Sequence, residues 1–457
     1  MSASKLKPLD AVWLMMETPD TPMHVGVLAT FQKPARATAS YFADLADELR
    51  ATEAVAPWNC RVSRGVVRKL SEDPDFELDY HFRRSALPEP GGERELGRMI
   101  SRLHSNALDR ARPLWEFHLI EGLENNRFAF YIKIHHALVE AVNGVPALLS
   151  TLASSARARN VSPLWTVPLS AVESGDLMDD LGSSGLEGTL DSAGALGRAV
   201  VDMARAAVQP SERNSFIFPR GTPRSTLNRH INAQRRFATQ EIEQARIEAL
   251  AEATDSTVNE MLTYLMGSSL RRFFKEYNAL PDESLVGIMP VSLQERSQHL
   301  AGNAIAGLRV SLGTNFGDPL ARLDAVKASM QEVREDRASL PEEAVTSYVL
   351  LRAAPLYASQ LGVLGRFVPP LYNLAVSNTA GSDKPLYFNG ARLESIYPLA
   401  PLMQHSALSV DCVSYNGNFN IGFTGARDTL PHLQRMAVYL GKAMTDLEEL
   451  LAAGEVA

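Results

Sequence analysis

The stretch FAFYIKIHHALVEAVNG, residues 128–144, decides the fold. Residues 128–134 are aromatic and β-branched with a single lysine, which predicts a strand inside a sheet. From Ala137 onward apolar residues recur at helical spacing, so a helix is expected to follow. His135 and His136 therefore stand where a strand passes into a helix, a position at which α/β proteins often gather reactive groups.

The same reasoning extends to the residues before this stretch. Residues 116–121 should form a strand joined to 128–134 by a tight turn at Asn125-Asn126, which makes the pair an antiparallel hairpin. Helices are expected at 10–16, 40–50, 93–106 and about 145–152, and a further strand at 24–31.

The rest of the chain repeats this mixture of helices and strands. Strands are expected at 234–239, 285–293, 304–312 and 373–378, and helices at 240–253, 257–277 with Thr257 as cap, 318–337, 342–364 and 430–451. Residues 405–415 and 418–425 flank Asn416-Gly417, a dipeptide that suits a two-residue hairpin turn.

Residues 169–194, rich in Ser, Gly, Asp and Glu, are typical of a linker, and a helix is expected at 195–208. With 457 residues, the chain is too long for one ordinary core. We predict an α/β fold of two sandwich domains joined by a crossover linker, with an N-terminal half at 1–168, the linker at 169–223 and a C-terminal half at 224–457.

Composition excludes several classes of protein. A net charge of -8 argues against nucleic-acid binding. Only Cys60 and Cys412 are present, in no metal-ligand spacing, and no secretory signal is recognisable, so a cytoplasmic location is expected. The apolar stretch 348–376 is broken by arginines and prolines and should not span a bilayer. A buried helix pair is the first expectation for it, and the lining of an apolar tunnel or a peripheral contact with a lipid surface stays open.

The two histidines suggest general base chemistry. An acyl transfer to a hydroxyl needs a base within reach, and histidine suits this role near neutral pH. Adjacent residues of a strand point to opposite faces, so at most one of the two should face a given cavity and the other should be structural. Our hypothesis is that His136 is the base. Glu140 is expected to pair with an arginine, Gly144 to relieve crowding, and His118 to be a core or face histidine.

Other interpretations stay open at this point. The histidines could be a buried structural pair. A zinc site built from two histidines and a glutamate lacks the HExxH spacing, so no metal is expected. No Ser elbow of the GxSxG kind appears, which disfavours a serine hydrolase.

Several separate segments carry a family resemblance. They are PLDAVWLMMETPDTPMHVG at 8–26, RPLWEFHLIEGL at 112–123, KIHHALVEAVNG at 133–144, MPVSL at 289–293 and PLYFNGARLESIYPLAPL at 385–402. On these segments the chain resembles the bacterial wax ester synthase/acyl-CoA:diacylglycerol acyltransferase family. The resemblance implies a fold like that of the CoA-dependent acyltransferases, with a tunnel between two domains.

The resemblance also implies an activity and its residues. Acyl-CoA would be the donor, a long-chain fatty alcohol or diacylglycerol the acceptor, and no cofactor would be needed. The histidines match the first part of the family's HHxxxDG pattern, whose second histidine is the base. The PLW element, Pro113, Leu114 and Trp115, is implied near a substrate channel; Asn259 is implied as support for the site, and Asn378 and Gly381 as substrate-binding residues.

The sequence departs from the family pattern at three places. Glu140-Ala141 replaces Asp-Gly, Asn259-Glu260 replaces the frequent Asn-Asp, and residues 377–382 read SNTAGS in place of SNVPGP. Two alternatives to the acyltransferase follow. One is a weakened or inactive homologue that binds acyl-CoA or neutral lipid, and the other is a condensation-type enzyme that acts on carrier-protein thioesters.

Overall fold

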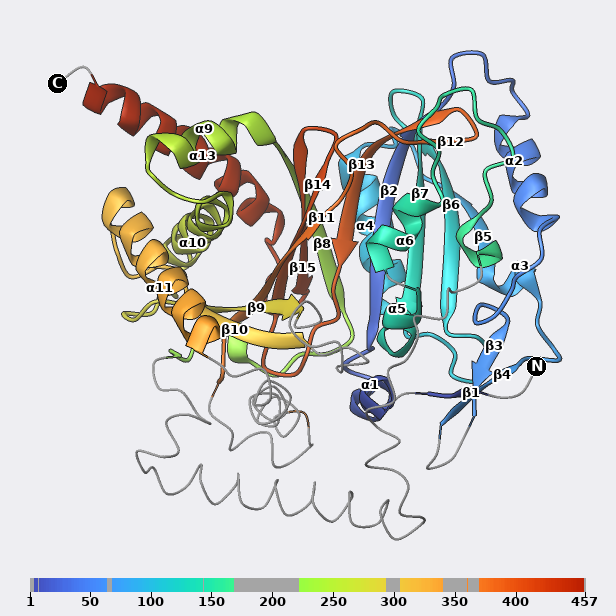
Figure 1. The fold of residues 1–457 in the computed structure, drawn as a ribbon, viewed down its shortest axis with the longest axis horizontal. Helices are drawn as coiled ribbons and strands as arrows, with labels where there is room; N and C mark the ends of the chain where they lie inside the picture. The colour runs from blue at the N-terminus through green and yellow to red at the C-terminus, as the bar shows by residue number, and fades with distance from the viewer. Residues whose placement is uncertain are drawn as a thin grey trace, which may run out of the picture.

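The histidine-bearing strand lies inside a six-stranded sheet in the computed structural model (Figure 1). The structure describes residues 4–6, 8–63, 68–142, 144–167, 222–292, 305–339, 360 and 370–455. A second six-stranded sheet lies beside the first, so the predicted α/β class with two sandwiches is confirmed.

The two sheets divide the strands as follows. The N-terminal sheet has the order β12-β13-β2-β7-β6-β5, formed by β2 (His24–Gln32), β5 (Phe82–Ala86), β6 (Trp115–Leu123), β7 (Arg127–His135), β12 (Tyr387–Phe388) and β13 (Ala391–Leu399). The C-terminal sheet has the order β10-β9-β11-β14-β15-β8, formed by β8 (Arg235–Glu243), β9 (Val286–Ser292), β10 (Ile305–Ser311), β11 (Leu374–Ala380), β14 (Leu408–Tyr415) and β15 (Asn418–Ala426). A small sheet joins β1 (Ser4–Lys5), β4 (Lys69–Glu72) and β3 (Cys60–Val62).

Helices cover both sheets. Those of the N-terminal half are α1 (Pro8–Met16), α2 (Tyr41–Arg50), α3 (Leu78–His81), α4 (Glu93–Ser105), α5 (His136–Val142) and α6 (Gly144–Ser150). Those of the C-terminal half are α9 (Gln244–Ala253), α10 (Val258–Glu276), α11 (Pro319–Ser339) and α13 (Gln434–Glu455), which lie together on the side of their sheet that faces away from the N-terminal half (Figure 1). Short 3-10 helices form at η1 (Leu164–Thr166) and η3 (Thr226–Asn228).

Both predicted hairpins are confirmed. β6 and β7 pair antiparallel, and the turn residues Asn125 and Asn126 have φ angles of 60° and 56°. β14 and β15 pair through Asn416 and Gly417, with φ angles of 48° and 82°. Asparagine and glycine accept positive φ at low cost, which explains why these dipeptides mark the turns.

β7 runs between β2 and β6, and the side chains on both of its faces are buried. Ile132 and Ile134 enter the main core of the N-terminal half, whereas Tyr131 packs into a separate cluster with residues of α4. Burying each such large side chain contributes about 1.5–3 kcal/mol. Core packing therefore holds the strand in place independently of any contact made by the histidines.

Two joints connect the halves. β13 comes from the C-terminal part of the sequence but pairs antiparallel with β2 in the N-terminal sheet. On another side, the edge strand β8 meets α4: Ser101 Oγ accepts the N–H of Phe237 at 3.0 Å, and Ser105 Oγ accepts the N–H of Arg235 at 2.8 Å. These serines satisfy donors that an edge strand otherwise leaves free.

Several predictions differ from the structure. The strand expected at 234–239 continues to Glu243, because β8 pairs with β15 along its whole length, and α9 begins at Gln244. A C-terminal half at 224–457 did not anticipate β13, and strands β3 to β5 were also missed. The domain boundaries stay predictions, and the helices expected at 195–208 and 342–364 fall outside the described residues.

Within the described ranges, every helix is too short or too polar to cross a membrane. The apolar stretch 348–376 falls largely outside those ranges.

Candidate active site

The strand-to-helix junction is tied to both neighbouring strands through its backbone. The N–H of His135 donates to the carbonyl of Leu114, just before β6, at 3.0 Å. The N–H of His136 donates to the carbonyl of Met23, just before β2, at 2.8 Å. The two histidines are thus held from opposite sides, which fixes the position at which α5 begins.

His135 is fully buried and its tautomer is set by its contacts. Its Nδ1 accepts the N–H of Ala137 at 3.1 Å, so its proton lies on Nε2, which is 3.7 Å from the Oε1 atom of Glu17. Burial would raise the pKa of Glu17, but His135, the N–H of Met23 and Arg110 outweigh that effect and lower it. The anionic Glu17 therefore faces the proton of His135.

His136 is partly buried and stacks on Trp13 of α1. The centroids of the two rings are 3.6 Å apart and their planes are inclined by 16°. Loss of water lowers the pKa of His136 to about 3, and the neighbouring His135 lowers it further in the same direction. His136 is therefore neutral near pH 7, with its proton-accepting form already present.

The buried Nδ1 atom of His136 has no hydrogen-bond partner among the described residues. A buried polar atom without a partner is costly and often marks a functional position.

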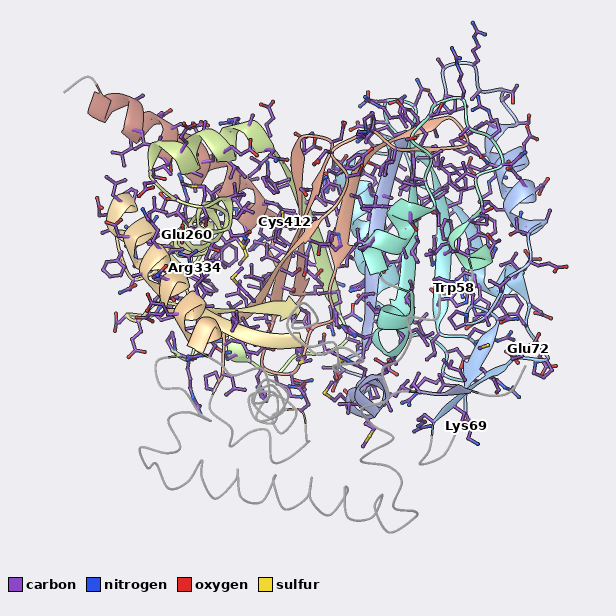
Figure 2. The ribbon with its side chains drawn as sticks, in the orientation of Figure 1. Trp58, Lys69, Glu72, Glu260, Arg334 and Cys412 are labelled. Carbon is purple, nitrogen blue, oxygen red and sulfur yellow. The ribbon has the colours of Figure 1, made fainter. Side chains whose placement is uncertain are left out.

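The PLW element supports the junction from within the core. Leu114 provides the carbonyl that holds His135, and both Leu114 and Trp115 are 1% exposed. Trp115 stacks on His81 and donates its indole N–H to the carbonyl of Trp58 at 2.7 Å, in the part of the N-terminal half labelled in Figure 2. Contacts with substrate for Pro113, Leu114 and Trp115 stay a prediction.

A buried group of charges lies on the strands that lead to the site. Lys133 Nζ is 2.9 Å from Glu116 Oε2, and His118 Nε2 is 3.3 Å from the same oxygen. Burial would raise the pKa of Glu116, but His118, Lys133 and Arg83 together lower it to about 2. His118 is 1% exposed, so its prediction as a core histidine is confirmed.

Two predicted site residues of the C-terminal half meet each other. The side-chain N–H of Asn378 donates to Oδ1 of Asn259 at 2.9 Å, and both residues are exposed. Gly381 lies just after β11, where an added Cβ would collide with the carbonyl oxygen of Ser414, so close packing requires a glycine. No contact among the described residues joins these three to the histidines.

Glu260, at the second departure from the family pattern, has a local role. It forms a capping box with Thr257: Thr257 Oγ1 accepts the N–H of Glu260 at 3.3 Å, and Glu260 Oε2 accepts the N–H of Thr257 at 2.8 Å. Its Oε1 atom binds Arg334 at 2.7 Å (Figure 2). Glutamate is long enough to reach both partners. The prediction of Thr257 as cap is confirmed.

The side chains of Glu140 and Ala141 lie outside the described part, as do the surroundings of Gly144, although α5 includes the first two residues and α6 begins at the third. The expected pair between Glu140 and an arginine stays a prediction. In the described ranges, no three His, Cys, Asp or Glu side chains are grouped so that they could hold a metal ion.

Sequence reasoning missed Trp13, Glu17 and Met23 as parts of the site. Their only signal was their place in the segment 8–26, which carries the family resemblance. α1 and the loop that follows it bring them beside the junction, and this long-range arrangement leaves no periodicity in the sequence.

Comparison with known proteins places the chain in a family. Residues 6–262 match the wax ester synthase/diacylglycerol acyltransferase catalytic domain, and residues 301–448 match the C-terminal domain of the same family. A putative diacylglycerol O-acyltransferase of Mycobacterium tuberculosis is 36% identical over 98% of this chain and 97% of its own length. A probable diacylglycerol O-acyltransferase of the same species is 34% identical over 97% and 98%.

Solved structures agree with this assignment. The wax ester synthase/diacylglycerol acyltransferase from Marinobacter aquaeolei VT8 aligns with a TM-score of 0.80 and 32% identity, over 98% of this chain and 100% of that one. The first condensation domain of the calcium-dependent antibiotic synthetase aligns with a TM-score of 0.55 and 16% identity, over 98% and 96%, and shares the fold alone. The chain therefore belongs to the wax ester synthase/diacylglycerol acyltransferase family and is an acyltransferase.

Proposed function

We propose that His136 is the general base with which this acyltransferase moves a fatty acyl group from acyl-CoA to the hydroxyl of diacylglycerol or of a long-chain alcohol. The observation that carries this proposal is the neutral, partly buried imidazole of His136, held at the strand-to-helix junction and stacked on Trp13.

The chemistry proceeds by direct attack. The acceptor oxygen bonds to the thioester carbon while His136 takes the hydroxyl proton. The carbon–sulfur bond then breaks, and the departing CoA thiolate receives that proton. The products are an ester and free CoA, and no acyl-enzyme is required.

The low pKa of His136 suits this role in one respect and opposes it in another. The base needs no prior deprotonation, but a weakly basic ring accepts a proton less readily. In the tetrahedral transition state the oxygen of the thioester carbonyl becomes negative beside the new imidazolium. That charge offsets the lost hydration and raises the basicity of the ring when it is needed.

Diacylglycerol is the acceptor to test first, since the relatives at 36% and 34% identity are named diacylglycerol O-acyltransferases. Hexadecanol is the second, because the structural relative from Marinobacter aquaeolei VT8 is also named a wax ester synthase.

The experiment incubates purified protein with palmitoyl-CoA and either acceptor, measures released thiol and identifies the ester by mass spectrometry. We expect ester formation by the wild type and at least a hundredfold loss, about 2.7 kcal/mol of transition-state stabilisation, in His136→Ala. His230→Ala is the matched control, because His230 is an exposed histidine of the C-terminal half. Equal ester formation by His136→Ala would remove the role given to His136.

A lipid-binding homologue without turnover is the second candidate, and the Glu140-Ala141 departure favours it. Alanine adds a methyl group where the family has glycine, and glutamate moves its carboxylate by one methylene. Acyl-CoA binding without ester formation in the wild type, together with ester formation in the double variant Glu140→Asp/Ala141→Gly, would support this candidate.

We also propose that the enzyme meets its lipid acceptor at a membrane or lipid-droplet surface. Met15 on α1, two residues from Trp13, is 72% exposed, more than any other large apolar side chain among the described residues. Sedimentation with diacylglycerol-containing vesicles tests this, and Met15→Asp should release the protein from them. Equal sedimentation of wild type and variant would contradict a contact through α1.

A further inference from the structure

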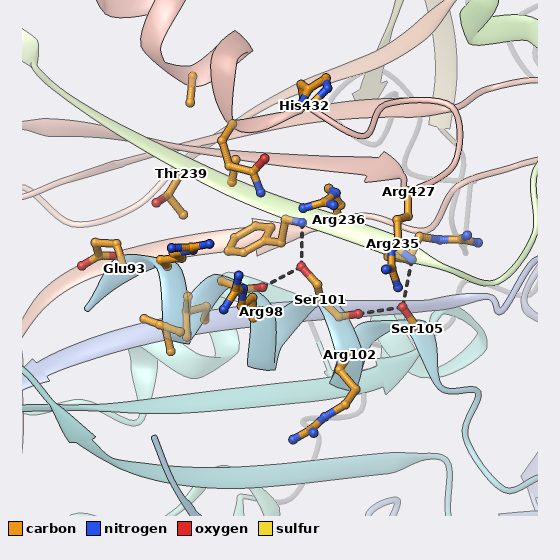
Figure 3. Close-up of a pocket in the computed structure, with 18 of the residues that line it drawn as sticks. Glu93, Arg98, Ser101, Arg102, Ser105, Arg235, Arg236, Thr239, Arg427 and His432 are labelled. Carbon is orange, nitrogen blue, oxygen red and sulfur yellow. Dashed lines mark hydrogen bonds between the residues drawn. The ribbon is translucent and has the colours of Figure 1, made fainter. Parts of the chain in front are cut away.

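A second feature of the fold is a cavity of about 1120 Å³ at the joint between the two halves. Its walls come from α4, from β8 and from the turn and helix that follow β15 (Figure 3). This is the joint at which Ser101 and Ser105 accept the N–H groups of Phe237 and Arg235. The cavity volume is sufficient for a nucleotide-sized ligand.

Arginines dominate the walls of this cavity. They are Arg94, Arg98 and Arg102 on α4, Arg235 and Arg236 on β8, and Arg427 after β15. The first three are four residues apart and therefore share one face of their helix. The acidic side chain in the lining is Glu93. This concentration of positive charge contrasts with the net charge of -8 of the whole chain.

Arg235 donates to the carbonyls of Asn232, Gln234 and Asp20, but most of the other arginines of the cavity lack a protein partner within the described part of the chain. The arginines of α4 form no hydrogen bond or ion pair there, and Arg427 reaches only the amide oxygen of Gln234, at 3.5 Å. The Nε atom of Arg236 is buried and has no hydrogen-bond partner there. A buried guanidinium nitrogen without a partner in a basic cavity indicates an anionic ligand.

Two lining residues contact the segments that carry the histidines. Arg235 donates to the carbonyl of Asp20 at 3.3 Å, in the loop whose Met23 holds the N–H of His136. Asn106, also in the lining, accepts a hydrogen bond at 2.9 Å from Lys133, two residues before His135. The basic cavity and the proposed base are thus separated by one loop and the end of one strand.

We propose that this cavity holds the 3′-phosphorylated adenosine diphosphate of the acyl-CoA donor, a proposal that rests on the acyl-CoA-dependent transfer proposed above. The phosphates of CoA and its thioester lie at opposite ends of the pantetheine arm. The arginines of the cavity would contact the phosphates, and the proposed base at the strand-to-helix junction would act near the thioester. Guanidinium groups bind phosphate oxygens through paired, charge-assisted hydrogen bonds.

A flat anionic membrane fits the site less well. The arginines line the walls of a cavity between α4, β8 and the segment after β15, whereas a bilayer surface engages side chains that project from a convex face. A folded acidic protein fits the site less well for the same reason, because its surface would have to reach arginines inside a cavity.

Isothermal titration with CoA and with 3′-phosphoadenosine 5′-phosphate tests the site without turnover. Arg98→Gln and the double variant Arg98→Gln/Arg236→Gln should weaken both ligands, by about tenfold for each guanidinium that contacts a phosphate. The exposed Arg36 lies outside the cavity lining and provides the control Arg36→Gln. Unchanged affinity for both ligands in the double variant would overturn the proposal.

Kinetics provide a second readout. The ratio of kcat/KM for palmitoyl-CoA to that for palmitoyl-pantetheine, which lacks the nucleotide, should fall toward one in the double variant. A constant ratio would contradict the site while leaving the proposed function intact. Nucleotide binding without ester formation would support the site and contradict the proposed function. Loss of binding only to phosphatidylglycerol vesicles, with CoA affinity unchanged, would assign the arginines to a membrane contact and overturn the proposal.

Discussion

The imidazole of His136 lies 3.6 Å from the indole of Trp13, with ring planes inclined by 16°. This stack joins α1 to the first residue of α5, so the orientation of the proposed base depends on a helix more than a hundred residues earlier in the chain. His136 has its backbone fixed by Met23 and its ring fixed by Trp13. Together they restrict the direction in which the ring can accept a proton.

Removing the stack should impair catalysis more than substrate binding. Trp13→Ala frees the ring of His136, and we expect kcat to fall by about tenfold to a hundredfold, the range produced by small misplacements of a reacting group. Trp13→Phe keeps a stacking surface and should retain most of kcat. Steady-state kinetics check this, and a similar kcat for Trp13→Ala and wild type at equal folded fraction would contradict it.

The pH profile follows from the lowered pKa of His136. Since the pKa is about 3, the free enzyme keeps this base neutral between about pH 5 and 8, and kcat/KM should not fall as His136 titrates in that range. Asp411 titrates within the same pH range, because burial raises its pKa to about 6, and its titration could also change kcat/KM. The measurement therefore uses Asp411→Asn as well. An acid limb near pH 6.5 that persists in Asp411→Asn would contradict the lowered pKa of His136.

Glu17 should act as a positioning residue through His135. In Glu17→Gln the charge that faces the Nε2 proton of His135 is lost while the shape is kept. We expect kcat to fall by about tenfold, equivalent to about 1.4 kcal/mol, with little change in KM. Glu121→Gln, a substitution on β6 outside the site, is the matched control. A parallel loss of stability and activity would indicate a purely structural role instead.

The sequence predicted those elements whose signals are local. Residues 128–144 indicate a strand that passes into a helix, and Asn416-Gly417 indicates a hairpin. Both are predictable because periodicity and turn chemistry are properties of neighbouring residues. β13 was not predicted, because its pairing partner β2 lies far away in the sequence. Nothing within residues 391–399 reveals which sheet they join.

The residues of the site also differ in whether a local sequence signal predicts them. His135 and His136 stand out as adjacent histidines at a junction, but Trp13 and Glu17 acquire their roles only when α1 folds against α5. The arginines of the basic cavity show a helical spacing at 94, 98 and 102 that also suits an ordinary solvated helix face. Only the meeting of α4 with β8 brings them opposite Arg236.

The capping box of α10 predicts a reciprocal effect on stability. Thr257→Ala removes one hydrogen bond of the pair and should lower the free energy of unfolding by about 1 kcal/mol. Glu260→Ala removes the other together with the contact to Arg334 and should cost at least as much. The double variant should lose less than the sum, because each side chain orders the other. Urea denaturation of the four proteins checks this. Strict additivity would show that the two hydrogen bonds are independent.

The buried pair of Glu116 and Lys133 should give the largest change in stability. Glu116→Gln leaves the ammonium of Lys133 buried without its counter-charge, which costs about 3–5 kcal/mol. The double variant Glu116→Gln/Lys133→Met removes that unpaired charge and should recover part of the loss. Denaturant unfolding at pH 7 measures both, and a single variant as stable as wild type would show that Lys133 finds another partner.

The pH dependence of this difference has a definite sign. The folded-state pKa of Glu116 is about 2, below its ordinary value of 4.5, so its carboxylate stabilises the fold above that ordinary value. The contribution is lost as the pH falls through the folded-state pKa. The gap in unfolding free energy between wild type and Glu116→Gln should therefore be full at neutral pH and narrow steadily below pH 4.5. A gap that stayed constant down to pH 2 would mean that the pair does not hold Glu116 in its charged form.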